Sequence, residues 1–184
     1  MNHYHIAVIV GSLRKESWNR KLANAVALLA PAEFSFKEAE IGDLPLYNQD
    51  DDALQAAAAK RLKQEIEAAQ GVLFVTPEYN RSIPGLLKNA IDHASRPRGQ
   101  NSWDGKPAGI IGASVGSLGT ALAQEHLRNI LAHIGMPTLA QPEVFIQVKE
   151  GLFDESGKIG PNSLEFLQNW MNRYAAWVKL NNQG

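Results

Sequence analysis

The sequence has no cysteine. A disulfide, a thiolate nucleophile and a thiolate metal site all need that residue, so all three are excluded. Long hydrophobic runs are missing too, because no stretch approaches the roughly 20 apolar residues that span a bilayer. The apolar run at residues 6–10 is too short for a signal-peptide core and leads into a glycine. We therefore expect a cytoplasmic protein that does not bind membranes.

Neither sign of charge is in excess, since the chain has 18 Lys and Arg residues and 19 Asp and Glu residues, for a net charge of −1. A nucleic acid or an anionic membrane would favour a basic face or stripe, and the sequence shows none. The hydrophobic share of 45% and the charged share of 20% are those of an ordinary globular protein. At 184 residues, the chain is predicted to form one domain over residues 1–184.

Short β-branched runs alternate along the chain with longer segments of helical period, which is the pattern of parallel βαβ units. Strands are predicted at residues 5–10, 34–41, 72–76, 108–113 and 144–148. Helices are predicted from residue 18 until Pro31 and at residues 54–69, 86–93, 121–134 and 164–180. These elements predict a three-layer α/β sandwich with right-handed crossovers. The irregular segment 96–106 is compatible with a mobile loop.

The loop after the first predicted strand has the chemistry of a phosphate cradle. Gly11 allows a tight turn, while Ser12, Ser17 and Asn19 offer side-chain donors and Arg14 offers a charged fork. The following helix adds the free amide groups of its first turn. The loop is neither a Walker A motif nor a Gly-x-Gly-x-x-Gly motif. The alternative interpretation is that Ser17 simply caps the helix.

The loop after the third predicted strand, residues 76–85, carries two prolines and a glycine. A stiff loop can aim several peptide groups at a planar ligand at little ordering cost, and Tyr79 would then lie against the ring. The alternative is a rigid turn with Asn80 in a left-handed conformation.

The loop after the fourth predicted strand, residues 112–120, has three glycines that allow close approach to a ligand, and Ser114 and Ser117 can hydrogen-bond to it. In an open α/β sheet, ligands bind outside the carboxyl ends of the strands, where strand order reverses. Periodicity alone does not separate a flavodoxin-like sheet from a Rossmann-type one. The three loops favour the flavodoxin-like fold, a five-stranded parallel sheet in the order 2-1-3-4-5.

Three motifs together resemble the NADPH-dependent FMN reductase family, and most of all its bacterial quinone and chromate reductase branch. They are Gly-Ser-Leu-Arg-x-x-Ser-x-Asn, Pro-Glu-Tyr-Asn-x-Ser-x-Pro-Gly-x-Leu-Lys-Asn-Ala-Ile-Asp and Ala-Gln-Glu-His-Leu-Arg. The match runs from Ile6 to the pair Pro142-Glu143 and onward. The resemblance implies a homo-oligomer, dimer or tetramer, that binds FMN. It also implies that NADPH or NADH supplies electrons for quinones, chromate, azo dyes or metal oxyanions in a ping-pong cycle.

The resemblance also implies which residues bind FMN. The phosphate is assigned to Ser12, Arg14, Ser17 and Asn19. The isoalloxazine ring is assigned, largely through backbone groups, to Pro77, Glu78, Tyr79, Asn80 and Ser82, with Ser114 and Gly116 at its far edge. No side chain need act as a nucleophile, because the flavin carries the redox chemistry.

Two positions depart from the family pattern. Arg81 stands where relatives often carry an aromatic residue or histidine, and His93 stands where tryptophan is common. We expect both to affect the choice of acceptor. Arg81, Arg96 and Arg98 are candidates for attracting an anionic acceptor or the nicotinamide phosphate, and the alternative is that they are solvated surface residues.

Two other classes of protein share this fold. A flavodoxin-type electron carrier would bind FMN and serve a protein partner, but such carriers are usually strongly acidic and have a Thr/Ser-Gly-Thr-type phosphate loop. A phosphoacceptor receiver domain needs an acidic pair after strand one and an aspartate at the end of strand three. Gly11-Ser12 and Thr76-Pro77 stand there instead.

No metal site is predicted. The acidic run 50–52 is typical of a solvated turn that begins a helix. His126 is interpreted as a packing or interface residue rather than a catalytic base, and the aromatic residues of the last helix as core.

Overall fold

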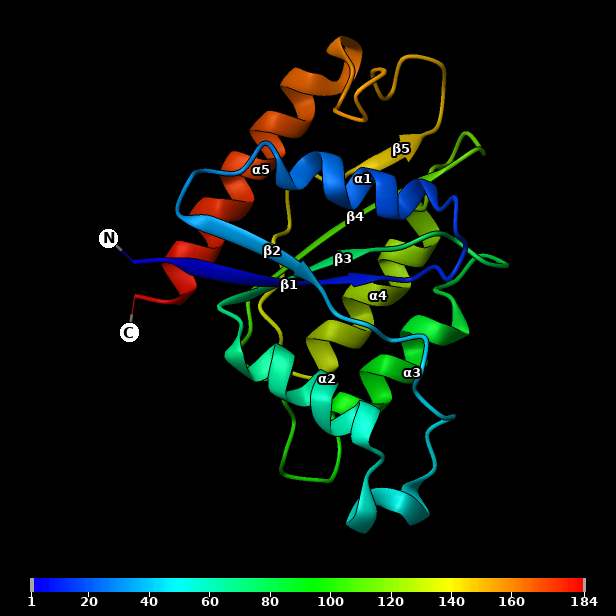
Figure 1. Cartoon of the computed structure of the whole chain (residues 1–184), viewed down its shortest axis with the longest axis vertical. Helices are drawn as coiled ribbons and strands as arrows, with labels where there is room; N and C mark the ends of the chain where they lie inside the picture. The colour runs from blue at the N-terminus through cyan, green and yellow to red at the C-terminus, as the bar shows by residue number, and fades with distance from the viewer. Residues whose placement is uncertain (1, 184) are drawn as a thin grey trace.

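The computed structural model describes residues 2–183, which contain one five-stranded sheet with helices on both faces (Figure 1). The strand order is β2-β1-β3-β4-β5 and every pairing is parallel, so the predicted sheet is confirmed. The strands are β1 (Tyr4–Val10), β2 (Phe34–Glu38), β3 (Gly71–Val75), β4 (Ala108–Ser114) and β5 (Phe145–Gln147).

The helices form two layers. They are α1 (Trp18–Ala27), α2 (Ala57–Ala68), α3 (Gly85–Ala94), α4 (Ala121–His133) and α5 (Pro161–Asn181), with a short 3₁₀ helix, η1 (Gln49–Leu54). α1 and α5 cover one face of the sheet, and α2, α3 and α4 cover the other (Figure 1). Among residues 2–183, no helix combines the length and the apolar character that crossing a membrane requires.

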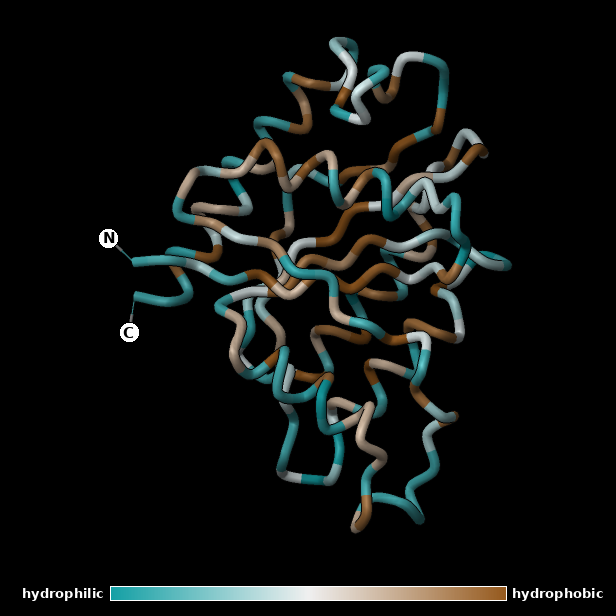
Figure 2. The backbone as a smooth tube through the Cα atoms, viewed as in Figure 1, coloured by the Kyte–Doolittle hydropathy of each residue, from teal (hydrophilic) through white to brown (hydrophobic). Residues whose placement is uncertain are grey.

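β1 shows why the central strands are apolar at successive positions. Ile6, Val8 and Val10 belong to the core under α1 and α5, whereas Ile9 belongs to the core under α2, α3 and α4. A parallel strand covered on both faces needs apolar side chains at odd and even positions alike. Figure 2 shows this as hydrophobic colour concentrated in the middle of the molecule.

The last helix has the predicted core role. Trp170 and Tyr174 are buried, and their rings stack with centroids 5.2 Å apart. The helix begins at Pro161, three residues before the predicted start, because proline suits the first turn, where its missing amide hydrogen costs nothing.

Two predicted elements are shorter or divided. The second strand ends at Glu38 rather than at residue 41. The predicted helix 54–69 becomes η1 and α2, because Gln55 takes an extended conformation between them. The acidic residues 50–52 lie in η1, where the Asn48 side chain accepts a hydrogen bond from the Asp50 amide.

The segment 96–106 is anchored, which corrects the expectation of a mobile loop. The Trp103 side chain is fully buried, and its Nε1 donates to the Ile91 carbonyl over 3.0 Å. The Lys63 ammonium of α2 donates to the carbonyls of Arg96 and Gln100. Composition suggested mobility, but contacts with α2 and α3 hold this segment in place.

Candidate functional site at the carboxyl edge of the sheet

The three candidate loops meet at one edge of the sheet. They follow β1, β3 and β4, which are neighbouring strands. Backbone hydrogen bonds join the loop starts, from the Gly11 amide to the Val75 carbonyl (3.0 Å) and from the Thr76 amide to the Ile111 carbonyl (3.1 Å). The predicted grouping of these loops is therefore present in the structure.

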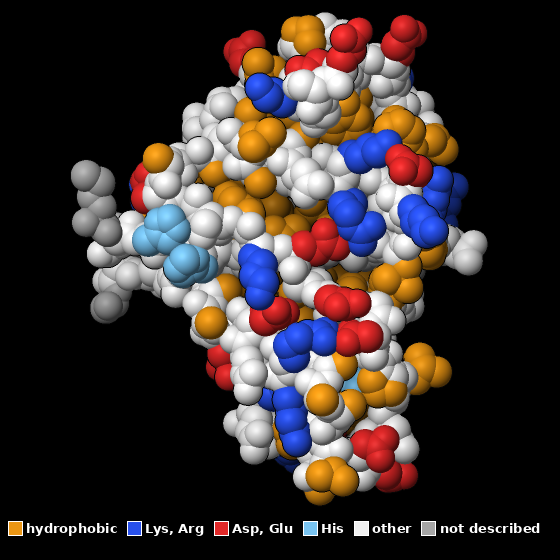
Figure 3. All heavy atoms as spheres, in the orientation of Figure 1, with side chains coloured by type: hydrophobic (Ala, Val, Ile, Leu, Met, Phe, Trp, Pro, Cys, Tyr) orange, Lys and Arg blue, Asp and Glu red, His pale blue; other side chains and the backbone are white. Residues whose placement is uncertain are grey.

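The first loop, residues 11–17, leads into α1 through an N-cap. Ser17 caps the helix by accepting a hydrogen bond from the Arg20 amide, and a contact with the phosphate stays a prediction. Ser12 and Ser17 are buried, whereas Arg14 is exposed. Figure 3 shows Lys and Arg side chains gathered at the right of this face, where Figure 1 places the start of α1.

The backbone of this loop has free donors. Among residues 2–183, no hydrogen bond in the structure uses the amide groups of Leu13, Lys15, Glu16 or Ser17. Unpaired amides at the start of a helix attract anions, because the peptide dipoles add a partial positive charge there. Together with the nearby hydroxyls and Arg14, this donor set fits a phosphate monoester such as that of FMN.

Asn19 has a different environment from the other predicted phosphate residues. Its side chain is buried, its Nδ2 donates to the Ala113 carbonyl, and its Oδ1 accepts from the Ala113 amide, both over 2.9 Å. This double hydrogen bond ties α1 to β4. Asn19 therefore fixes the first loop against the third, and a contact with the phosphate stays a prediction.

Arg20 and Glu38 were not among the site residues predicted from the sequence. The Arg20 guanidinium pairs with the Glu38 carboxylate and donates to the carbonyls of Ser12 (3.0 Å) and Arg14 (3.1 Å). One signal was available in the sequence, because a basic residue in the first turn of a helix opposes the helix dipole and needs a reason to be there.

The loop after β3 contains a tight turn. The amide and carbonyl of Tyr79 exchange hydrogen bonds with those of Ser82, at 3.0 and 3.1 Å. Asn80 and Arg81 between them have φ angles of 52° and 68°, so the left-handed Asn80 is confirmed and Arg81 shares its conformation. Left-handed backbone at both central positions is the geometry of a type I′ turn, which is strained for a bulky residue such as arginine.

Two side chains connect this turn to α4. One carboxylate oxygen of Glu78 accepts hydrogen bonds from the amides of Leu122 and Ala123, at 3.0 and 3.1 Å, and so caps the helix. The Ser82 hydroxyl lies 2.9 Å from Nδ1 of His126. A cavity of about 480 Å³ opens beside this pair. Arg81 is exposed at the tip of the turn.

The loop after β4 packs closely against its neighbours. A Cβ atom at Gly112 would overlap the Thr120 hydroxyl and the Thr76 carbonyl, so only glycine fits there. The Ser114 hydroxyl donates to the Gly119 carbonyl at 2.5 Å and shapes the turn around Gly116. The backbone of the second loop can approach the third only because position 112 has no side chain.

Large apolar side chains are exposed on all three loops. They are Leu13, Tyr79, Val115 and Leu118, with exposed fractions of 61%, 49%, 72% and 52%. Apolar groups gathered at a sheet edge indicate a surface that something covers. A flat aromatic ring such as isoalloxazine suits such a surface, so the ring loops also fit FMN.

Other predicted residues lie elsewhere. Arg96 and Arg98 follow α3 and precede β4, so the parallel sheet places them at its amino edge, away from the three loops. His93 is buried on α3, with its Nε2 2.8 Å from the Pro45 carbonyl, and its ring lies edge-on to Tyr47. The structure does not bring these residues to the candidate site within one chain.

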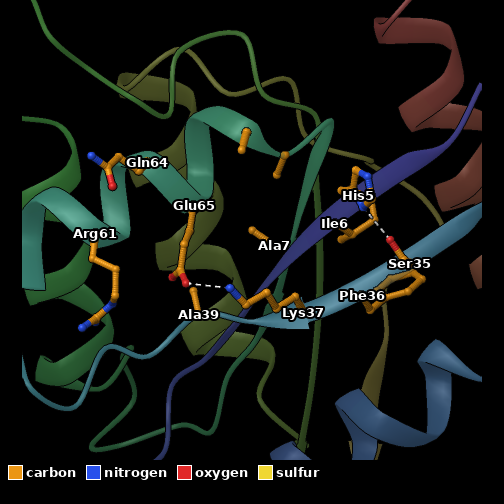
Figure 4. A pocket seen from close by; sticks show the side chains of 12 residues that line it. His5, Ile6, Ala7, Ser35, Phe36, Lys37, Ala39, Arg61, Gln64 and Glu65 are labelled. Atoms are coloured by element: carbon orange, nitrogen blue, oxygen red, sulfur yellow. Dashed lines mark hydrogen bonds and ion pairs between the residues drawn. The ribbon is translucent and has the colours of Figure 1, made fainter.

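A further cavity, of about 440 Å³, lies between α2 and the strands β1 and β2 (Figure 4). The Lys37 and Glu65 ion pair crosses it, and His5 bonds to Ser35 on its wall. Its lining contains none of the three loops. Among residues 2–183, no cluster of three or more His, Asp or Glu side chains is arranged to hold a metal ion.

Comparisons with known proteins agree with this geometry. The profile of the NADPH-dependent FMN reductase family matches residues 4–151. The chain is 53% identical over 175 residues to a 2-hydroxy-1,4-benzoquinone reductase of Burkholderia sp., covering 95% of this chain and 96% of that protein. It is 43% identical over 173 residues to an NAD(P)H-dependent FMN reductase of Pseudomonas aeruginosa, covering 93% of each.

A solved structure is similar over nearly the whole chain. It is the flavoenzyme NAD(P)H:(acceptor) oxidoreductase FerB from Paracoccus denitrificans, with a TM-score of 0.93 and 45% identity, covering 97% of this chain and 98% of that one. The family profile spans most of the sequence and includes all three loops at the carboxyl edge of the sheet. The chain therefore belongs to the NADPH-dependent FMN reductase family.

Proposed function

We propose that this protein is an FMN-dependent NAD(P)H:quinone oxidoreductase. The observation that carries the proposal is the juxtaposition of two surfaces at one sheet edge. One is a loop of unpaired amides, serines and Arg14, and the other is a patch of exposed apolar side chains on the adjoining loops. The first suits the phosphate and the second suits the ring of one FMN molecule.

Bound FMN would supply the redox chemistry, taking a hydride from NAD(P)H and passing two electrons to the acceptor. The amides of residues 13 and 15–17, with the side chains of Ser12, Ser17 and Arg14, bind and orient the phosphate. The rigid turn at residues 79–82 aims backbone groups at the ring. Tyr79 and the apolar side chains of the third loop exclude water from it.

The overall reaction is NAD(P)H + H⁺ + quinone → NAD(P)⁺ + hydroquinone. Donor and acceptor use the same place in turn, which is a ping-pong cycle. The quinone is the first candidate acceptor because relatives with about half of their residues identical are named quinone reductases. Chromate, azo dyes and metal oxyanions are further candidates, and the exposed Arg81 guanidinium would favour the anionic ones.

We further propose that the enzyme is a cytoplasmic homo-oligomer, a dimer or a tetramer. The apolar side chains of the three loops remain about half exposed or more in a single chain, which supports a second copy covering part of this edge. Light scattering on a sizing column measures the mass in solution. A monomeric mass at micromolar concentration would contradict the oligomer.

The experiment for the function is a spectral titration of the purified protein. We expect a yellow protein with one FMN per chain, bleached by NADPH or NADH under anaerobic conditions and restored by 1,4-benzoquinone. Parallel double-reciprocal plots would support the ping-pong cycle, and intersecting plots would contradict it.

Two other results would overturn the proposed function. A protein that takes up no FMN on reconstitution is not a flavoenzyme. A yellow protein that neither nicotinamide bleaches would fit the flavodoxin-type carrier instead.

A further inference from the structure

Arg20 occupies an unusual place for a basic residue. It lies in the first turn of α1, where the helix dipole opposes positive charge. Its side chain folds back toward the loop before the helix instead of extending into solvent. There it makes contacts with two other parts of the chain, namely the loop and the end of β2.

The contacts use the planar fork of the guanidinium. Nε donates to both carboxylate oxygens of Glu38, at 3.0 and 3.1 Å, while the two terminal nitrogens reach the carbonyls of Arg14 (3.1 Å) and Ser12 (3.0 Å). An ammonium is a point charge and cannot serve all of these acceptors at once. The arrangement therefore depends on arginine and not merely on positive charge.

The two carbonyl contacts set the direction of the neighbouring amides. A trans peptide is planar, with its C=O and N–H groups on opposite sides. Holding the Ser12 carbonyl toward Arg20 turns the Leu13 amide away from it, and holding the Arg14 carbonyl does the same for the Lys15 amide. These are two of the unpaired amides in the candidate phosphate loop.

Glu38 completes the arrangement. Its carboxylate at the end of β2 neutralises Arg20, and Lys21 pairs with Glu16, so the unpaired positive charges of the loop are Arg14 and Lys15. Arg20 thus shapes the loop without being the group that attracts the anion. A loop held in its binding geometry loses less conformational entropy when the ligand binds.

We propose that Arg20, held by Glu38, is a positioning residue that orients the backbone amides of residues 13 and 15 toward the phosphate of FMN. The inference rests on the proposed function and names a residue pair that acts on one part of the cofactor. It predicts that the pair affects recognition of the phosphate and has no effect on recognition of the isoalloxazine ring.

The experiment compares FMN with riboflavin, which has the same ring and no phosphate. Full-length apoprotein is titrated with each, and binding is followed by quenching of flavin fluorescence. Arg20→Lys keeps the charge and removes the fork, so we expect FMN to bind about tenfold more weakly. Glu38→Gln removes the charged partner of the guanidinium and should also weaken FMN binding. Riboflavin affinity should be unchanged in both variants.

Arg61→Lys is the matched control. Arg61 pairs with Asp43 in the same two-pronged way (2.7 and 2.9 Å) and also donates to a backbone carbonyl, that of Glu40. Its exposure is close to that of Arg20, with 36% of the side chain accessible against 32%. Its hydrogen bonds go to Glu40 and Asp43 and to no residue of the loop, so this variant should keep the ratio of FMN to riboflavin affinity.

The outcomes separate the two proposals. Unchanged FMN affinity in Arg20→Lys, or an equal loss for FMN and riboflavin, overturns the positioning role while leaving the flavin function intact. A wild-type protein that binds neither flavin overturns the proposed function itself. Circular dichroism of each apoprotein shows whether it is folded. If Arg20→Lys does not fold, the FMN and riboflavin affinities of Glu38→Gln test the positioning role instead.

Discussion

Residues 11–17 and residues 96–106 are both irregular, and both carry arginine, glycine and serine. They lie at opposite edges of the sheet, since one follows β1 and the other precedes β4. In the first loop, amide donors are left free and Arg20 holds carbonyls. In the second, lysine holds carbonyls and a tryptophan fills the core.

The difference shows that two segments of similar composition can have different backbone environments. A cation holds backbone carbonyls in both segments. Only the first leads into the start of a helix at the carboxyl edge of the sheet, where ligands bind in open α/β folds. The second joins α3 to β4, and its contacts stabilise the fold.

The largest expected effect tests the anchoring of the second segment. Trp103→Ala removes a fully buried side chain and its hydrogen bond to Ile91, so we expect the free energy of unfolding to fall by about 3–5 kcal/mol. Leu13→Ala, in the exposed first loop, should change it by less than about 0.5 kcal/mol. Urea unfolding measures both, and equal losses would break the comparison.

The second test concerns the arginines. Arg14→Ala removes the exposed guanidinium beside the unpaired amides, so FMN should bind about thirtyfold more weakly, or ~2 kcal/mol. Arg98→Ala, at the opposite edge, should leave FMN affinity unchanged. Fluorescence titration measures both, and a loss with Arg98→Ala would show that the second segment reaches the flavin of another copy.

The smallest expected effect is the change with pH in the free energy of unfolding that comes from Lys63, the residue that holds the second segment. Burial lowers the pKa of Lys63 below its usual value of 10.5, although Glu67 and Asp52 act in the opposite direction. Between the folded and unfolded pKa, the unfolded chain binds more protons, so stability rises with pH through that window. The cost of burying the charge is present below the folded pKa and is relieved as pH approaches 10.5.

Comparison with Lys63→Met isolates this group, because the other titrating residues are the same in both proteins. We expect the unfolding free energy of the wild type to rise relative to the variant as pH increases from 7 toward 10.5. Urea unfolding at several pH values measures the difference. A difference that is constant or falls with pH would contradict the burial of Lys63.

The sheet and the grouping of the three loops were predictable because each depends on local patterns. Continuous apolar runs indicate buried parallel strands, and glycine and proline mark the turns between them. Element boundaries were less accurate, as in the predicted helix 54–69, where an extended Gln55 separates η1 from α2. Nothing in the local sequence demanded that break.

Roles that depend on a distant partner could not be predicted. Asn19 matched a phosphate motif, but its amide bonds to Ala113, 94 residues later in the chain. His126 bonds to Ser82, 44 residues earlier. Arg98 was a candidate for attracting an anionic acceptor, but it follows α3 and precedes β4, which places it at the amino edge of the sheet.

By itself, the sequence determined the fold, the edge of the sheet where the three candidate loops meet, and the family, because hydrophobic period, turn residues and contiguous motifs are local properties. Tertiary structure alone decided which amides stay free, which arginine faces solvent and which donates to the carbonyls of the loop. The reason is physical. A hydrogen bond or a buried contact depends on the neighbour that folding supplies, and that neighbour comes from another strand or helix.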